Sequence, residues 1–310
     1  ETGIRSGLGV QRSTGLTILN GQFGLSLRTG ASGVGGTERL RIDSSGNIGA
    51  GIAPSSGARL WIASNENPIV GTRYNAGADG SVLFLQHSRS NTIGTNVALN
   101  DNDEVGTIQF RAYASNNSSV KVAASIKAEV NGTTGSAGVP ADLIFGTGTS
   151  LVNATERLRI SSEGYVTKPA HPAFFVTMNG GDQTTAAANI MPFDTVVHNN
   201  GGHFKTSGAD IYNFVCPVDG YYFFGGQVWL KHGSGTGNHA RWEIWRDTQI
   251  LALAGWHQNG VNLNDMQSSA SVTVYCDAGA KVYMEADYAL TYWRGNSSQP
   301  HTFFHGHLIG

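Results

Sequence analysis

The sequence predicts an all-β protein in which lean, repetitive β-modules precede a C-terminal jelly-roll β-sandwich. Three observations predict this fold class. Glycine is frequent, with 42 among 310 residues, and charged residues make up only 14% against the roughly 25% of an average domain. Apolar residues alternate in short runs between Gly, Asn and Ser turns, which is typical of strands. Of the 29 Phe, Tyr and Trp residues, 8 precede Lys168 and 21 follow it, so most core-forming rings lie in the C-terminal part.

The first segment, residues 1–57, is a Gly-rich β-shaft. Its clearest strand is Thr37 to Ile42, where Leu40 and Ile42 point to one face and Arg39 and Arg41 to the other. Large apolar residues are too few in this segment to close a core within one chain. Either the segment is flexible, or the same strands from several chains share one core.

A repeat favours the shared core. The stretch from Thr155 to Val166 reproduces the stretch from Thr37 to Ile48 almost residue for residue, and Ala58 to Ile62 is a shorter echo. Flexible linkers do not keep such alternation, so we interpret the copies as units of a repetitive shaft.

Residues 58–167 form the second shaft module, which ends in the second copy of the repeat. Residues 168–172 contain two prolines and predict a stiff, extended link. Further strands are expected in this module at 81–86, 106–113, 120–130 and 143–145.

The third segment, residues 168–310, carries the densest apolar passage, 211–230, which predicts two strands joined by the turn Pro217-Val218-Asp219-Gly220. Nine strands in about 140 residues indicate a sandwich or jelly roll. A single helical turn is allowed near 185–189. The expected strands are 174–178, 194–198, 211–215, 221–230, 241–246, 249–256, 269–276, 281–289 and 302–309.

Charge and cysteine usage exclude several classes of protein. The net charge of −2 and the absence of Lys/Arg clusters argue against nucleic acid as a partner, and no apolar run is long enough for membrane insertion. Cys216 and Cys276 lie on apolar strand faces and are expected to be free, buried thiols. A disulfide between them would require adjacent strands.

Candidate ligand-binding residues lie on two expected loops of the third segment. The first loop offers Trp256, His257 and Asn259, and the second offers Tyr292, Trp293 and Arg294. Aromatic faces stack on sugar rings and amides bond hydroxyls, so these loops predict a glycan site. The alternative is that Trp256 and Trp293 fill the sandwich edge or an interface between chains.

A metal site is the second candidate. His305 and His307 stand on one face of the last strand, and a threefold axis would bring six imidazoles together around a metal ion. The alternative is that both are edge or core histidines. No other cofactor is expected. The Asp residues of this segment nearly all fall in turns or at strand ends, so no catalytic residues are assigned and an enzyme is disfavoured.

Residues 214–223, followed by Phe224, carry the pattern F-x-C-P-V-x-G-x-Y-x-F, and residues 304–308 carry F-x-G-x-L. In these two motifs the third segment resembles the globular head of complement component one q and its tumour-necrosis-factor-like relatives. Residues 278–280 lack its usual Gly-Asp. The resemblance covers about 173–310 and implies a ten-stranded jelly roll that assembles as a trimer.

The first two segments resemble tail fibres of tailed bacteriophages, in which E-R-L-R-I-x-x-x-G-x-V/I-G units recur in trimeric shafts. Residues 38–49 and 156–166 carry this likeness. Together the two resemblances imply a non-catalytic, homotrimeric phage tail-fibre protein of the extracellular virion. Its head would bind a glycan or protein receptor on the host surface, and other tail proteins would join its N-terminal end. The alternatives are a purely structural virion fibre, in which the head is a trimerisation clamp, and a non-viral cell-surface adhesin.

Overall fold

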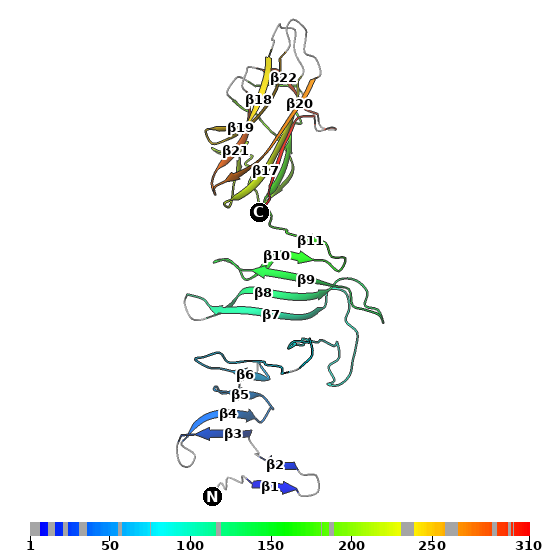
Figure 1. Cartoon of the computed structure of the whole chain (residues 1–310), viewed down its shortest axis with the longest axis vertical. Helices are drawn as coiled ribbons and strands as arrows, with labels where there is room; N and C mark the ends of the chain where they lie inside the picture. The colour runs from blue at the N-terminus through cyan, green and yellow to red at the C-terminus, as the bar shows by residue number, and fades with distance from the viewer. Residues whose placement is uncertain are drawn as a thin grey trace. The chain divides into compact units, whose positions relative to one another are not determined.

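The computed structural model describes most of the chain, and all regular elements in the described part are β-strands (Figure 1). This confirms the all-β fold class. Among the described residues there is no helix of the length and apolarity that crossing a membrane requires. The described residues are 7–11, 16–20, 24–30, 36–54, 58–74, 76–115, 119–180, 182–185, 189–230, 239–257, 266–286, 290–296, 299 and 301–310.

The first compact unit, residues 1–84, contains a hairpin and a small sheet. The hairpin consists of β1 (Gly7–Gln11) and β2 (Leu16–Asn20). The sheet has the order β3-β4-β5-β6, with β3 (Gly24–Thr29), β4 (Thr37–Asp43), β5 (Ile48–Ala50) and β6 (Leu60–Ile62). Because β6 pairs with β5 in parallel, the boundary expected between residues 57 and 58 falls inside this sheet.

Residues 81–86 were expected to form a strand, and this prediction is wrong for the single chain. The segment has no regular structure, and its apolar side chains face solvent, with Leu83 76% and Phe84 83% exposed. A strand requires a hydrogen-bonded neighbour, and the described part of the chain supplies none to this segment.

The second compact unit, residues 85–310, begins with a five-stranded antiparallel sheet that we call the shaft sheet. Its order follows the sequence in reverse, β11-β10-β9-β8-β7, because each strand turns back beside the one before it. The strands are β7 (Glu104–Tyr113), β8 (Val120–Val130), β9 (Ala141–Thr147), β10 (Thr155–Ile160) and β11 (Val166–Thr167).

The two copies of the repeat form similar local structures. In each copy a strand leads into a turn, and an arginine pairs with the glutamate three residues before it. The distance is 2.6 Å both between Arg41 Nη2 and Glu38 Oε2 and between Arg159 Nη2 and Glu156 Oε2. The second copy has a further partner, since Arg159 also pairs with Asp142 of β9, whose side chain is only 1% exposed.

The C-terminal domain, which we define as residues 173–310, is a sandwich of two sheets. The larger sheet contains β12 (Ala173–Thr177), β13 (Asp182–Thr185), β15 (Thr195–Asn200), β17 (Gly220–Leu230), β20 (Met266–Cys276), β22 (Leu290–Arg294) and β23 (Phe303–Leu308). The smaller sheet contains β14 (Asn189–Ile190), β16 (Phe214–Val215), β18 (His239–Arg246), β19 (Gln249–His257) and β21 (Lys281–Ala286).

A single hydrophobic core lies between these two sheets. Of the 22 buried hydrophobic residues in the described part of the chain, 19 belong to this core. Aromatic rings dominate it: Phe174 stacks on Phe214 at a centroid distance of 4.8 Å and meets Phe304 edge-on at 4.9 Å. Such pairs stabilise a core beyond the area they bury.

Two details of the C-terminal domain differ from expectation, and a third lies mostly outside the described residues. The strand expected at 211–215 is only β16, because Tyr212 has a φ of +68° and ends the extended run. Residues 292–294 were expected in a loop but belong to β22. The helical turn expected near 185–189 is flanked by strands β13 and β14, and residues 186–188 lie outside the described residues.

The link before β12 is fixed to one end of the C-terminal domain. The Asn200 side-chain amide donates to the carbonyls of Pro169 and His171, at 2.7 Å each, and the Leu308 amide donates to the Pro172 carbonyl at 3.0 Å. Because β17 begins at this end, its 11 residues carry the chain about 36 Å to the opposite end of the domain.

Candidate functional site

The end of the C-terminal domain opposite the link, which we call the apex, holds described strand ends from both predicted ligand-binding stretches. Leu230 at the end of β17 pairs with Trp293 of β22, and His257 at the end of β19 pairs with His239 at the start of β18. A hydrogen bond of 2.8 Å from Trp242 Nε1 to Ser268 Oγ joins the two sheets near these ends. Figure 1 shows β18, β20 and β22 running to the same end.

Several of the predicted ligand-binding residues lie at or beyond the limits of the described structure. Trp256 and His257 are the last two residues of β19, and Tyr292 lies in β22; for these three the backbone alone is described. Asn259 lies outside the described residues. The structure therefore places the first three at the apex, and their role in binding remains a prediction.

Trp293 requires a correction. The sequence suggested an exposed aromatic platform, but its side chain is fully buried in the hydrophobic core. The reason is the alternation of β22, which turns residue 293 toward the core because this stretch is a strand and not a loop. A buried indole has no face for a sugar, so Trp293 is a core residue.

Arg294, the next residue, lies in a half-buried polar and aromatic cluster at the apex. Its guanidinium carbon is 5.2 Å from the centroid of the Trp229 ring, and that ring meets the His301 imidazole edge-on at a centroid distance of 4.1 Å. The Asn296 amide nitrogen lies 3.2 Å from His301 Nε2. Cation–π stacking holds the planar guanidinium in a fixed orientation.

Sequence reasoning missed two members of this apical cluster, Trp229 and His301. Trp229 was assigned to a buried strand, although the alternation of β17 buries Tyr222, Phe224 and Val228 and leaves residue 229 on the other face. That alternation was the available signal. His301 was dismissed as a loop residue. Burial and the charge of Arg294 lower the pKa of His301, so its ring is the neutral form at pH 7.

His305 and His307 lie on the outer face of the larger sheet, as expected of residues two apart in a strand. Both rings contact Phe223, at centroid distances of 5.6 and 5.5 Å. His305 also contacts Phe175 and Phe303. We call these five residues the aromatic face. Tyr221 and Tyr275 continue it at its edge, 56% and 44% exposed.

The aromatic face is shaped around the His305 ring. A Cβ atom on Gly225, the residue opposite His305 on β17, would lie 2.6 Å from His305 Nε2, so glycine makes the space that the imidazole occupies. Burial among the aromatic rings, followed by the charge of His307, lowers the pKa of His305. The His305 ring is therefore the neutral form near pH 7, in largely apolar surroundings.

A metal ion on these histidines stays a prediction. Within the described residues of one chain, no group of three or more His, Cys, Asp or Glu side chains is arranged to hold a metal. One chain contributes only His305 and His307, so a complete set of ligands requires other copies.

Cys216 and Cys276 are buried and carry free thiols, in agreement with expectation. A hydrogen bond between the two thiols and burial raise the pKa of Cys216, which keeps it protonated. The two positions are near each other because the Cys216 backbone bonds to Ala280 and Gly279, in the turn that follows Cys276.

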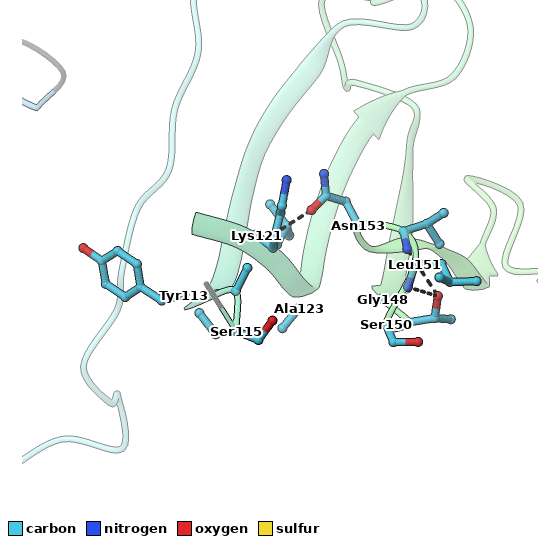
Figure 2. Close-up of a pocket in the computed structure, with 13 residues that line it drawn as sticks. Tyr113, Ser115, Lys121, Ala123, Gly148, Ser150, Leu151 and Asn153 are labelled. Atoms are coloured by element: carbon cyan, nitrogen blue, oxygen red, sulfur yellow. Dashed lines mark hydrogen bonds between the residues drawn. The ribbon is translucent and has the colours of Figure 1, made fainter. Parts of the chain in front are cut away.

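A groove of about 460 Å³ opens at one end of the shaft sheet (Figure 2). Tyr113 of β7, Lys121 of β8 and the loop after β9 line it. Two of its polar side chains are engaged by the chain itself: Asn153 Oδ1 accepts from the Val122 amide at 3.1 Å, and Thr149 Oγ1 accepts from two amides of its own loop. These bonds hold the loop in place, so the groove is a weaker candidate than the apex.

Comparison with known proteins identifies the C-terminal domain. Residues 173–309 match the family model of the C1q domain, which confirms the resemblance drawn from 214–223 and 304–308. Among solved structures, Eiger TNF from S. frugiperda is 11% identical with a TM-score of 0.37, covering 46% of this chain and 94% of that one. The globular domain of zebrafish complement 1qA protein is 18% identical, with a TM-score of 0.34 and coverages of 45% and 98%. Murine APRIL at pH 5.0 is 12% identical, with a TM-score of 0.34 and coverages of 45% and 99%.

Proposed function

We propose that this chain is a non-catalytic, homotrimeric tail-fibre protein of a bacteriophage, and that its C1q-like domain binds the surface of the host cell. The observation that carries the proposal is the aromatic face. The domain already has a closed core of its own, so a second aromatic cluster on the outside of the larger sheet serves assembly rather than folding. C1q-like domains typically form trimers and bind partners.

The fibre and its virion context rest on the repeat. Both copies of the E-R-L-R-I unit keep the same arginine–glutamate pair, and both stand in modules with little core of their own. This is the composition of a shaft whose chains share their apolar residues. Other tail proteins would join the N-terminal end, and the fibre would be exposed on the outside of the virion.

The receptor site is proposed at the apex, on the side of the domain away from the link. Arg294 and Asn296 supply donors for the hydroxyl and carboxylate groups of a surface glycan, and the stacked Trp229 fixes the guanidinium. Trp256, His257, Asn259 and Tyr292 would add to this site. Three identical sites on one tip gain avidity on a repetitive surface, because the second and third contacts face a high effective concentration.

The test combines solution mass with binding to whole cells of candidate hosts. We expect the full chain to sediment at three times the chain mass of 32.7 kDa and to bind one host saturably. Arg294→Lys keeps the positive charge but loses the planar guanidinium group and its paired N–H donors, so binding to the host should weaken about tenfold or more. Arg246→Lys, the same change at the opposite end of β18, is the matched control and should bind normally.

Each of the other outcomes favours a different function or a different position of the binding site. A trimer that binds no host would contradict the receptor role and favour the structural fibre, with the C-terminal domain as a clamp. A monomer would contradict both. A trimer that binds cells but is equally sensitive to Arg246→Lys would place the receptor site away from the apex.

A further inference from the structure

The shaft sheet has two chemically different faces. Strand register places Ile108, Ile126, Phe145 and Leu158 side by side in one row across four strands. Phe110 and Leu143 flank this row on the same face, because side chains two apart in a strand share a face. We call these six residues the apolar face. All of them are hydrophobic, and none carries a charge.

The opposite face of the shaft sheet is mainly polar, and its central charges pair within the chain around the buried Ile144. Arg159 pairs there with Asp142 and with Glu156, and Lys127 pairs with Glu129. The Asn131 amide adds a hydrogen bond of 3.0 Å to each Asp142 oxygen. A face whose charges are already paired can stand in water, so it needs no further layer.

The apolar face, in contrast, has no layer packed across it in the described chain. Ile108 is 42% exposed, Phe110 53% and Leu143 38%, while the other three side chains are half-buried by their neighbours in the sheet. Leu85 reaches this face at its edge, where it lies against Gly106. Antiparallel sheets normally bury one face against a second layer. Here that layer is missing from the single chain.

We propose that the apolar face packs against the same face of other copies of this chain, so that three shaft sheets enclose one shared core around the fibre axis. This inference rests on the proposed homotrimer and adds an interface that is independent of the C-terminal domain. The occupant is a second copy because the face is neutral and self-complementary, so identical faces meet without burying an unpaired charge.

The size of the face fits this role. The four strands that carry it, β7 to β10, lie about 4.8 Å apart and average about 8.5 residues at about 3.3 Å per residue, so they cover roughly 540 Å². Two such faces in contact bury roughly 1,100 Å², above the roughly 1,000 Å² expected of a specific interface.

Thiol labelling of the full-length chain tests the proposal. Phe110→Cys places a thiol on the apolar face, and Gln109→Cys places one on the polar face of the same strand, one residue away. In the single chain both positions are exposed, so both thiols would react with a maleimide at similar rates. We expect Phe110→Cys to react at least tenfold more slowly than Gln109→Cys. Ile108→Cys provides a second, independent position on the apolar face. Cys216 and Cys276 are buried and react only on unfolding.

Mass measured on the same samples separates this inference from the proposed function. A trimer in which the thiols of Phe110→Cys and Ile108→Cys both react slowly with the maleimide supports the shared core. A trimer in which both react as fast as Gln109→Cys overturns the inference, because the C-terminal domains alone then hold the chains together. A monomer overturns the inference and the homotrimer together, whatever the labelling rates.

Discussion

The C-terminal domain closes two sheets over one core, whereas the shaft sheet is a single layer with an apolar face on one side. Both consist of antiparallel strands of similar length. They differ in where the burial comes from: 19 buried hydrophobic residues lie between the two sheets of the domain, whereas the remainder of the described chain has Leu99, Val130 and Ile144. The domain has the core of an independent folding unit, and the shaft sheet depends on what covers it.

The largest effect on stability is expected from a substitution in the core of the C-terminal domain. Phe224 is fully buried and touches Phe174, Phe214, Tyr222 and Phe304, so Phe224→Ala should lower the free energy of unfolding by about 3–5 kcal/mol. Urea denaturation followed by tryptophan fluorescence measures this domain, because five of the six tryptophans lie after residue 168.

Val197→Ala is the control for Phe224→Ala, since the Val197 side chain is 64% exposed in the same sheet. It should change the free energy of unfolding by no more than about 0.5 kcal/mol. Equal effects of the two substitutions would mean that the domain is not organised around this core.

The second prediction compares the two copies of the repeat. Arg159→Leu leaves the Asp142 carboxylate buried without its ion pair, which should destabilise the shaft sheet by about 3 kcal/mol. Burial raises the pKa of Asp142, but the hydrogen bonds from Arg159, Asn131 and Ser162 outweigh it and lower the pKa overall. Hydrogen exchange of the amides in β9 and β10 should accelerate in this variant.

Arg41→Leu is the matched change in the first copy of the repeat. Its partner Glu38 is 19% exposed, against 1% for Asp142, and keeps Arg28 as a second partner, so exchange in β4 should change far less. If both variants accelerate exchange to the same degree, the buried Asp142 does not distinguish the copies.

A smaller effect is expected when the pH is lowered, because the aromatic face contains a histidine whose pKa is lowered in the folded chain. Because the pKa of His305 is lowered in the folded chain, the folded state binds this proton less readily than the unfolded state does. The stability that neutral His305 contributes is complete above its ordinary pKa of 6.5 and is lost as the pH falls through the window below that value. The pKa values of His203 and His301 are also lowered by burial, so three rings contribute.

We therefore expect the urea midpoint of the C-terminal domain to fall between pH 7 and pH 5, and His305→Gln to remove part of that slope. His87→Gln, in the other part of the chain, should leave the slope as it is. A slope unchanged in His305→Gln would show that the ring is solvated when folded.

Much of this fold follows from local sequence. The alternation of Leu40 and Ile42, and of Tyr222 and Phe224, predicts strands that the structure contains, and the motif at 214–223 is sufficient to indicate the family of the C-terminal domain. Local patterns fail where a partner decides the outcome. Residues 81–86 have strand composition but no neighbour in the described chain, and 292–294 were expected in a loop although β13 and β17 pair with them.

The candidate site was less predictable than the fold. Arg294 was predicted because aromatic and amide residues stand beside it in the sequence, but the cluster that it forms with Trp229 and His301 joins residues distant in sequence. Trp293 shows the opposite error: its aromatic chemistry suits a ligand, and only the strand that contains it reveals that it faces the core.

The fixed link has a mechanical consequence. If the chain is the proposed fibre and holds a receptor at the apex, it is pulled at the other end through residues 169–172, so that tension enters the domain along β12. That strand is hydrogen-bonded on one side to β15 and on the other to β23. Tension along the strand direction loads these bonds together in shear, rather than opening them one by one. In the proposed fibre, this attachment geometry would make the domain resist extraction by flow or cell motion, independently of the affinity of the proposed site at the apex.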